Sequence, residues 1–146
     1  NVDIVDVIFN NSDLSNQVFD NKLLSRVVFN NCKLLGTSFV NSNLKDIKFN
    51  NSNCKYINLF SSSLTNIEII DSNFSNSVFT ETKIKNIELN NSTFNETEFI
   101  KTNLKDIDFS TCNIERIIFD IDSLKGIKIN VLQASDIVRL FGVQIK

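Results

Sequence analysis

The sequence predicts an all-β solenoid, in which short extended segments and turns alternate along a rod. The chain aligns with itself in blocks of ten residues, without a gap, from residue 2 to about residue 130. Within each block a large apolar residue recurs at every fifth position, as at Leu44 and Phe49. A period of five matches neither the 3.6 of an α-helix nor the 2.0 of a strand. The chain must therefore turn after every fifth residue.

Each group of five residues has a pattern that assigns its side chains to the inside or the outside of the rod. A smaller or β-branched residue lies two positions before each large one, as Ser42 and Ile47 do, so strand alternation directs both to the same side. The residue between them, for example Asn43, then faces outward. The remaining two positions are rich in Asn, Ser, Asp and Lys. Asn, Ser and Asp suit corners because their side chains bond to nearby backbone.

The groups of five resemble the consensus of the pentapeptide-repeat family, which is Ala/Ser/Cys/Thr, then Asp/Asn, then Leu/Phe, then two variable residues. Close matches are Ser42-Asn43-Leu44-Lys45-Asp46, Ser72-Asn73-Phe74-Ser75-Asn76 and Thr102-Asn103-Leu104-Lys105-Asp106. In that family four groups of five make one square coil of a right-handed quadrilateral parallel β-helix. The resemblance implies roughly six and a half coils over residues 1–130. At a strand spacing of about 4.8 Å such a rod is about 30 Å tall.

Stacking positions twenty residues apart predicts the surroundings of the corner asparagines and of the cysteines. The corner pairs Asn10-Asn11, Asn30-Asn31 and Asn50-Asn51 fall above one another, so amide ladders are expected. The three cysteines occupy inward positions, and Cys32 and Cys112 share a face four coils apart, about 19 Å at the usual strand spacing. That separation is beyond disulfide reach, so we expect buried free thiols and neither a zinc site nor a catalytic cysteine.

The repeat ends at the C-terminal segment. From Val131 the register fails, Asn130 is a good helix N-cap and Gly142 a good stop. These signals predict a short capping helix at about 131–141 and an extended tail over 143–146, in the same domain as the β-helix. The apolar face is expected to contain Val131, Ala134, Ile137, Val138 and Phe141. In relatives a similar segment joins two rods, which implies a homodimer through Ile137, Val138, Leu140, Phe141, Val143 and Ile145.

Composition excludes several classes of function. There is no histidine for general base or triad chemistry, and the three glycines are too far apart to form a glycine-rich phosphate-binding loop. A formal net charge of −2 does not suit a direct nucleic-acid binder. No apolar run approaches the ~20 residues needed to cross a bilayer, and no signal sequence is visible. We therefore expect a cytoplasmic protein that is not an enzyme and has no cofactor or metal.

Charge is distributed unevenly over the predicted faces. The face of residues 42–46 is mildly basic, with Lys22, Arg26, Lys45, Lys83, Lys85, Lys105 and Lys125 against Asp3, Asp6, Asp46, Asp106 and Asp122. Lys22 and Asp122 occupy inward positions near the two ends, where they mark either frayed coils or a buried functional charge. The next face is expected to stack the acidic residues Glu68, Asp71, Glu88 and Asp108.

That acidic face permits one interpretation by resemblance. Members of the Qnr group, which protect topoisomerases from quinolones, are similar rods thought to present acidic surface as a mimic of duplex DNA. The resemblance implies binding to DNA gyrase or topoisomerase IV and quinolone tolerance. This chain departs from that group because Lys33, Lys48, Lys55 and Lys101 interrupt its acidic faces and no loop insertion breaks its register.

An apolar feature favours a different function. Six apolar residues fall at outward positions of one face: Val18, Val40, Phe60, Val78, Ile100 and Ile118. Contiguous exposed apolar surface marks interfaces. The leading hypothesis is a non-enzymatic protein-interaction or structural rod that uses this face for an unknown protein partner or for lateral self-association. The DNA-mimic interpretation is the alternative.

Overall fold

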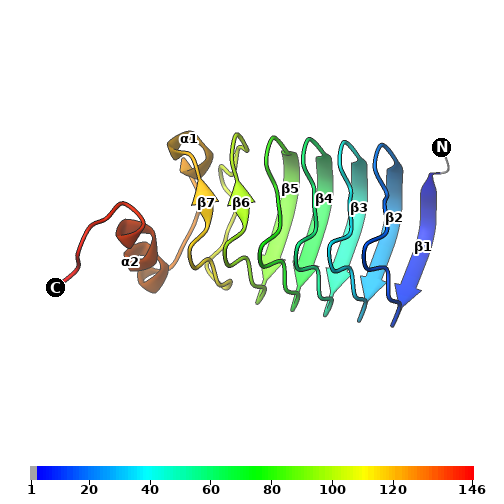
Figure 1. Ribbon diagram of the computed structural model, residues 1–146, viewed down its shortest axis with the longest axis horizontal. Coiled ribbons are helices and arrows are strands. Elements are labelled where there is room, and N and C mark those ends of the chain that lie inside the picture. Colours follow the sequence, from blue (N-terminus) through cyan, green and yellow to red (C-terminus); the bar gives the residue numbers. More distant parts are fainter. Residues whose placement is uncertain (1–2) are drawn as a thin grey trace.

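The computed structural model describes residues 3–146 and forms one elongated solenoid (Figure 1). Residues 1 and 2 of the predicted repeat lie outside the described residues. In the main sheet, residues twenty positions apart pair in parallel, as Phe9 does with Phe29. The predicted parallel β-helix of about six coils is confirmed. The sheet stacks in chain order β1 (Ile4–Asn10), β2 (Leu23–Asn30), β3 (Asn43–Asn50), β4 (Ser63–Ile70) and β5 (Lys83–Asn90).

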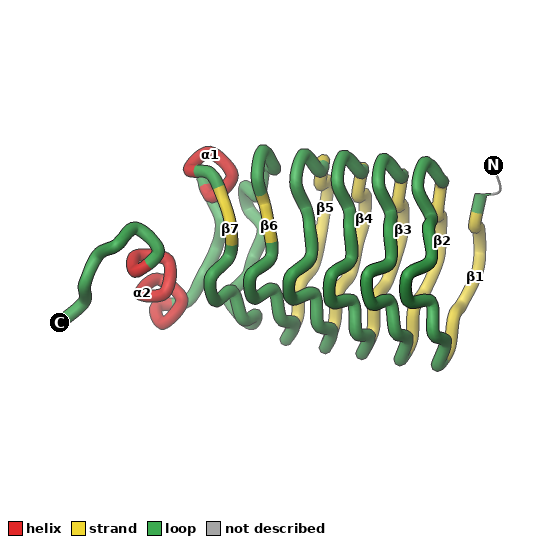
Figure 2. Tube along the Cα trace, in the orientation of Figure 1, coloured by secondary structure: helices red, strands yellow, loops and turns green. Residues whose placement is uncertain are grey.

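Each coil of twenty residues has four faces. Faces 1 and 2 carry the long strands, each of which bends at one corner as it passes from face 1 to face 2. Faces 3 and 4 are joined mainly by single bridges and turns, so Figure 2 shows strand along one side of these coils and loop along the rest. In the coil of residues 41–60, the faces are residues 42–45 (face 1), 47–50 (face 2), 52–55 (face 3) and 57–60 (face 4).

The corners depend on a backbone conformation that few residues adopt readily. In the coil of residues 41–60, φ is 55° at Asp46, 48° at Asn51 and 61° at Tyr56. This left-handed conformation costs most L-residues about 1–2 kcal/mol, whereas Asn and Asp visit it more often because their short polar side chains bond locally. The abundance of Asn and Asp at every fifth position follows from that cost.

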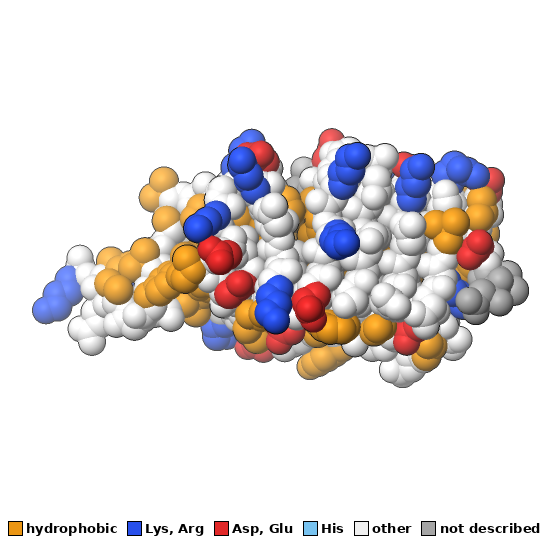
Figure 3. Space-filling view, turned by 90° about the horizontal axis from the view of Figure 1, so that it is seen from above, with side chains coloured by type: hydrophobic (Ala, Val, Ile, Leu, Met, Phe, Trp, Pro, Cys, Tyr) orange, Lys and Arg blue, Asp and Glu red, His pale blue; other side chains and the backbone are white. Residues whose placement is uncertain are grey.

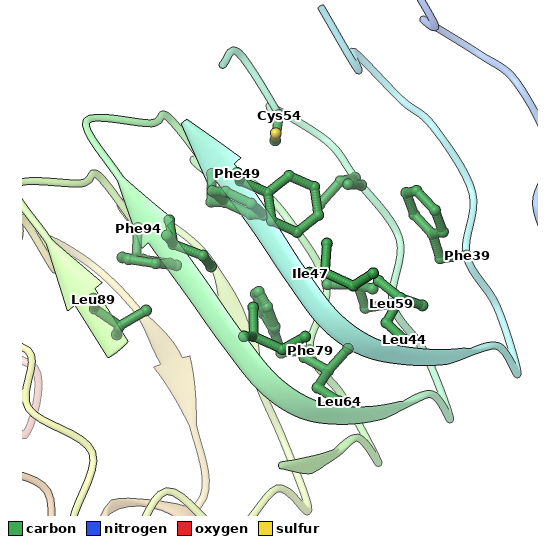
Figure 4. Close-up of a cluster of buried hydrophobic side chains, with 14 of the residues drawn as sticks. Phe39, Leu44, Ile47, Phe49, Cys54, Leu59, Leu64, Phe79, Leu89 and Phe94 are labelled. Carbon is green, nitrogen blue, oxygen red and sulfur yellow. The ribbon is translucent and has the colours of Figure 1, made fainter. Parts of the chain in front are cut away.

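Large side chains fill the interior in columns. Phe9, Phe29 and Phe49 stack along the rod with ring centroids 5.3 and 5.0 Å apart and planes within 10° of parallel. Figure 4 shows such residues from successive coils converging on one shared interior. Each stacked pair contributes about 0.5–1.5 kcal/mol beyond the burial of its area. A coil in isolation could not bury these rings, so stability comes from contacts between neighbouring coils.

The small inward residues connect successive coils through hydrogen bonds. The hydroxyl of Ser42 donates to the carbonyl oxygen of Phe19 at 2.6 Å, and that of Thr82 donates to Leu59 at 2.7 Å. A buried carbonyl left without a donor costs about 1–3 kcal/mol. The repeat therefore uses Ser or Thr at this position for a donor as well as for its small volume.

The amide ladders and the free thiols are confirmed. Asn30 Nδ2 donates to Asn10 Oδ1 at 3.0 Å, and Asn51 Nδ2 donates to Asn31 Oδ1 at 2.5 Å. The three cysteines are buried and unpaired. Burial raises the pKa of the Cys54 thiol well above its usual range, so this thiol stays protonated and unreactive at neutral pH.

The C-terminal end of the rod contains a helix that the sequence pattern did not predict. After β6 (Glu98–Phe99) and β7 (Ile118–Phe119) on face 4, the chain forms α1 (Ile121–Leu124). This turn carries Asp122 outward, so its predicted inward placement is wrong. Ser123 takes the buried position instead, and its Oγ accepts from Thr102 N at 3.2 Å. Lys22, at the other end, is half-buried.

The predicted capping helix is confirmed as α2 (Val131–Arg139). Asn130 caps it, its side chain accepting from Gln133 N while Gln133 Oε1 accepts from Asn130 N, and φ at Gly142 is 77°. The predicted apolar face is wrong at Val131, which is 86% exposed. Gln133 is buried instead because its Nε2 donates to Phe109 O at 2.7 Å and Cys112 O at 2.6 Å. The helix thus covers carbonyls at the open end of the last full coil.

Candidate interaction surfaces

The described part of the chain presents its candidate functional residues on its outer faces. Among residues 3–146 no group of three His, Cys, Asp or Glu side chains is placed to hold a metal ion. No helix within that range has the length and apolar character to span a membrane. The inward side chains are packed against one another. Any function of this region therefore depends on side chains of the four faces and the two ends.

Face 4 places all six residues of the predicted apolar stripe on one side of the rod. Each coil has two outward positions on this face, and in every coil one is apolar and the other polar. The apolar residue holds one of these positions at Val18, Val78 and Ile118 and the other at Val40, Phe60 and Ile100, so the track follows a zigzag along the rod. The pairs, with the apolar residue first, are Val18 and Asp20, Val40 and Ser38, Phe60 and Asn58, Val78 and Thr80, Ile100 and Glu98, and Ile118 and Asp120.

The polar members of these pairs bind one another or the backbone. Ser38 Oγ donates to Asp20 Oδ1 at 2.5 Å, and Thr80 Oγ1 donates to Glu98 Oε2 at 2.5 Å. Asn58 Oδ1 accepts from Phe60 N at 3.0 Å. Side chains that are already bonded need less water, so covering this face costs less than covering free polar groups.

The apolar members remain accessible, whereas the polar members around them are bonded. Val18 is 63% exposed, Phe60 37% and Ile118 48%, and the other three stripe residues are half-buried. Water therefore contacts an apolar track that extends over six coils. We call these six residues the face 4 stripe.

Face 2 carries the predicted acidic residues in a short column. Glu68 pairs with Glu88 in the ladder of β4 and β5, and Asp108 lies at the equivalent position of the next coil. Lys48 pairs with Glu68 at one end and Lys128 bridges to Asp108 at the other. Asp71 lies separately, at a corner. The acidic column is therefore three coils long and ends in lysine on both sides.

The pKa of Asp108 and the surrounding charges are consistent with a short acidic patch. Hydrogen bonds from Ser110 lower the pKa of Asp108, and the charge of Lys128 lowers it further. On the side of the rod seen in Figure 3, basic and acidic side chains are interspersed along the length. No single band of one charge is visible on that side.

Faces 1 and 2 contain a discontinuity that the sequence pattern did not reveal. The parallel ladder is continuous from β1 to β5, but within residues 3–146 no backbone hydrogen bond joins residues 83–90 to residues 103–110. Faces 3 and 4 stay connected across the same step, as Phe94 N to Asn113 O at 2.8 Å shows. The coils are therefore open on two faces and closed on the other two. We call this opening the seam.

The C-terminal segment exposes much of its apolar surface. Phe141 is 54% exposed, Val143 49% and Ile145 47%, while Val138 and Leu140 are each 39% exposed. Ile137 packs against the core. Phe141 also contacts Phe119, with ring centroids 5.8 Å apart. The segment thus covers part of the rod's end and leaves an apolar surface beyond it.

Sequence comparison places the chain in a family. The family model described as "Pentapeptide repeat region" matches residues 2–73, and the model described as "Pentapeptide repeats (8 copies)" matches residues 72–115. The protein belongs to the pentapeptide-repeat family. A comparison with curated protein sequences gives no match.

Several solved structures are similar to the chain. HetL, involved in heterocyst differentiation regulation in Nostoc sp. strain PCC 7120, is 10% identical with a TM-score of 0.44, covering 87% of this chain and 86% of its own. A trypsin-treated variant of QnrB1, a plasmid-mediated fluoroquinolone resistance protein, is 13% identical with a TM-score of 0.40 and coverage of 98% and 99%. A thylakoid-lumen protein of Arabidopsis thaliana is 18% identical with a TM-score of 0.39 and coverage of 73% and 70%. Identities this low carry no function to this chain.

Proposed function

We propose that this protein is a non-enzymatic interaction module that binds a partner protein through the face 4 stripe. One observation supports the proposal: in each of six successive coils, face 4 presents one accessible apolar residue beside a polar residue. Such a track has an apolar centre and satisfied polar neighbours, as protein interfaces do. Phe60 lies near its middle and is the aromatic anchor, the residue type that dominates binding energy at interfaces.

The solenoid is suited to this task because its surface is preorganised. Stripe residues are fixed by the ladder bonds of the coils that carry them, such as Phe39 N to Asn58 O at 2.7 Å and Phe79 N to Glu98 O at 2.7 Å. Little conformational freedom remains to be lost when a partner binds, so more of the contact energy contributes to affinity.

Charge substitutions test the proposal. Phe60→Glu combined with Ile100→Glu introduces two charges on the stripe without touching the core. The matched control, Asn53→Glu with Asn113→Glu, makes the same change at outward positions of face 3. Crosslinking in cells followed by mass spectrometry identifies a partner with the unaltered protein, and binding of the purified partner is then measured for all three. We expect at least a tenfold loss for the stripe variant and no loss for the control. Unchanged binding and assembly in both variants would remove the stripe from consideration.

A second candidate function, topoisomerase binding by DNA mimicry, depends on the column of Glu68, Glu88 and Asp108. Stacked carboxylates at the spacing of a parallel ladder present repeated negative charge, as a phosphate backbone does. A DNA gyrase supercoiling assay with and without a fluoroquinolone tests this role. Inhibition or drug protection at micromolar protein that is lost in Glu68→Gln with Glu88→Gln supports mimicry. No effect from the unaltered protein rejects it.

We also propose that two copies associate through the C-terminal segment defined by Ile137, Val138, Leu140, Phe141, Val143 and Ile145. The exposed apolar side chains of that segment support the proposal. Light scattering tests it: the full chain is expected to be a dimer, and Phe141→Asp with Val143→Asp a monomer. A monomeric full chain rejects it. Binding at face 4 does not depend on this association, so the two results are independent.

A further inference from the structure

The seam separates two strand edges that are bonded everywhere else in the main sheet. In earlier coils Ser63 N donates to Ser42 O at 2.9 Å and Lys83 N donates to Ser62 O at 2.9 Å. Within the described residues, Asn103 N has no equivalent bond to Thr82 O. The edge of β5 (Lys83–Asn90) that faces residues 103–110 therefore resembles the free edge of a sheet.

The coil beyond the seam keeps its bonds to the residues that follow it. Asp106 N donates to Gly126 O at 2.9 Å and Phe109 N donates to Lys128 O at 2.8 Å. At the corner before the seam, in contrast, the backbone bond that Asp71 N makes to Asn90 O at 3.0 Å has no equivalent from Asn91 N to Ser110 O among the described residues. The ladder is therefore interrupted only between β5 and residues 103–110.

One corner residue distinguishes this step from the earlier ones. The corner residues Asn31, Asn51 and Asn91 all have positive φ, but Thr111 at the next equivalent corner does not. A β-branched residue avoids the left-handed region. The Thr111 hydroxyl instead accepts from Asn91 N at 3.1 Å, in the place of a backbone carbonyl.

The neighbouring Cys112 weakens a second connection. Ser52 N donates to Ser72 Oγ, and Ser72 N donates to Ser92 Oγ, both at 3.1 Å. At the next step the acceptor position is a thiol, which is a weak acceptor. The Ser92 backbone nevertheless bonds to the Cys112 thiol. Cys32 holds the same column position while the ladder of β1 and β2 is continuous, so a thiol alone does not open the seam.

The opening exposes part of the core. Leu89 is 8% exposed, whereas Ile69 at the same position of the previous coil is 1% exposed. Ile84 and Ile87 are half-buried, while their equivalents in β4 are buried. A hollow of about 260 Å³ lies at this edge, lined by Ile84, Asn86, Ile87, Asn103, Lys105, Asp106 and Ile107.

The hollow continues along face 1 and is rimmed by lysine. A larger open recess, about 790 Å³, shares Ile84 and Asn103 with it and includes Lys83 and Lys101. Within residues 3–146, none of Lys83, Lys85, Lys101 and Lys105 lies in an ion pair. Glu81 and Asp106 also line these openings, so three lysines face two carboxylates and the excess charge is positive. A segment bound here would find strand backbone, apolar side chains and this excess of positive charge together.

We propose that the seam binds an extended peptide segment of a partner protein, in which apolar residues alternate with acidic ones. The peptide adds as a strand to the free edge of β5, since an unpaired edge is a template for strand addition. On face 1, strand alternation directs an apolar side chain toward Ile84 and the acidic side chains on either side of it outward to Lys83, Lys85 and Lys105. This site is separate from the face 4 stripe and does not depend on the function proposed for it.

Peptide binding tests the proposal by fluorescence polarisation. The probe is a labelled ten-residue peptide of alternating isoleucine and aspartate, flanked by glycines. A control peptide has proline at every isoleucine position and so lacks half of the strand donors. We expect saturable binding of the alternating peptide and at least tenfold weaker binding of the proline peptide. Equal binding of the two peptides, or none of either, overturns strand addition.

Two pairs of substitutions locate the site. Thr111→Asn with Cys112→Ser restores the residues found at the equivalent earlier positions and is expected to close the seam, with at least a tenfold loss of peptide binding and a higher melting temperature. Lys85→Glu with Lys105→Glu should weaken the acidic peptide at least tenfold and favour a peptide with lysine in place of aspartate. Phe60→Glu with Ile100→Glu, on face 4, should leave peptide binding unchanged. Binding that survives in both seam variants overturns the assignment, and the peptide comparison on the unaltered protein decides the matter if a variant fails to fold.

Discussion

The coils from β1 to β5 and the coil of residues 101–120 have the same inward pattern but different connections. In the first region, Phe9, Phe29 and Phe49 stack along the axis and every strand is bonded to the next. In the second, Phe109 lies below Leu89 in its column, and faces 1 and 2 are unbonded to β5. Edge-on contacts between columns occur in both regions, as Phe49 with Phe74 and Phe109 with Phe94 show. The inward residues thus determine that a coil forms, while the corner residues determine whether it joins its neighbour.

The largest expected effect on stability comes from shortening the same core residue in each of the two regions. Ile67 and Ile87 occupy the same inward position of β4 and β5, but Ile67 is 3% exposed and Ile87 is half-buried beside the seam. Ile67→Ala should lower the free energy of unfolding by about 3–4 kcal/mol and Ile87→Ala by about 1–2 kcal/mol, because less area is lost and less cavity is made at the seam. Urea denaturation measures both. Equal losses would show that the core is closed at both places.

The cap of the last coil should give the next largest effect. Gln133→Ala removes the donors to the carbonyls of Phe109 and Cys112, at a cost of about 2–3 kcal/mol. Gln133→Glu is the matched control for shape, because it retains the acceptor for Asn130 N but lacks the two donors. Both variants should lose stability in thermal or urea unfolding. A stable Glu variant would mean that the helix cap, and not the donated bonds, explains the buried position.

Exchange of the corner residues tests the comparison in both directions. Thr111→Asn should raise the free energy of unfolding by about 1 kcal/mol, because asparagine tolerates the left-handed corner. Asn91→Thr should lower it by about 1–2 kcal/mol and extend the opening toward β4. Urea denaturation with both variants measures the pair. Changes of the same sign would contradict a role for the corner.

The smallest expected effect concerns corners that carry an unsuited residue within the intact ladder. Tyr56 has φ of 61° and its side chain is 61% exposed, so it has little contact energy to offset its backbone strain. Tyr56→Asn should stabilise the protein by about 0.5–1 kcal/mol, measured as a shift of the urea midpoint. Asn66→Ala, at another left-handed corner, is the converse change and should destabilise. A neutral Tyr56→Asn together with a neutral Asn66→Ala would show that φ does not limit stability at corners.

Much of this arrangement could be predicted from the sequence because a period of five identifies inward residues directly. Phe29 over Phe9, Asn30 over Asn10 and the Asn130 cap all follow from position alone. Burial of Gln133 could not be predicted in this way, because it depends on carbonyls at the end of the rod that receive no hydroxyl from a next coil, whereas Phe29 O receives that of Ser52. The outward position of Asp122 in α1 could not be predicted for a similar reason, because the last half coil has no following coil to hold it in register.

The seam could not be predicted from the repeat pattern either, although one residue of the sequence indicates its place. Thr111 is a threonine where earlier coils have Asn or Asp, and it keeps the polar character that a pattern search accepts. Its effect depends on a backbone angle, which composition does not report. The zigzag of Val40, Phe60 and Val78 could be assigned to one face from position. The bonds that occupy its polar neighbours could not, because they depend on side-chain geometry.

Hydrogen exchange of backbone amides tests the central claim most directly, because it reports each bond of the ladder. Alternate residues of a parallel strand direct their N–H groups to opposite neighbours. All interior amides of β4 (Ser63–Ile70) should therefore be protected, while in β5 only those directed to β4 should be, and the others should exchange at least a hundredfold faster. Uniform protection throughout β5, equal to that of β4, would show that the ladder continues to residues 103–110 and would contradict the seam.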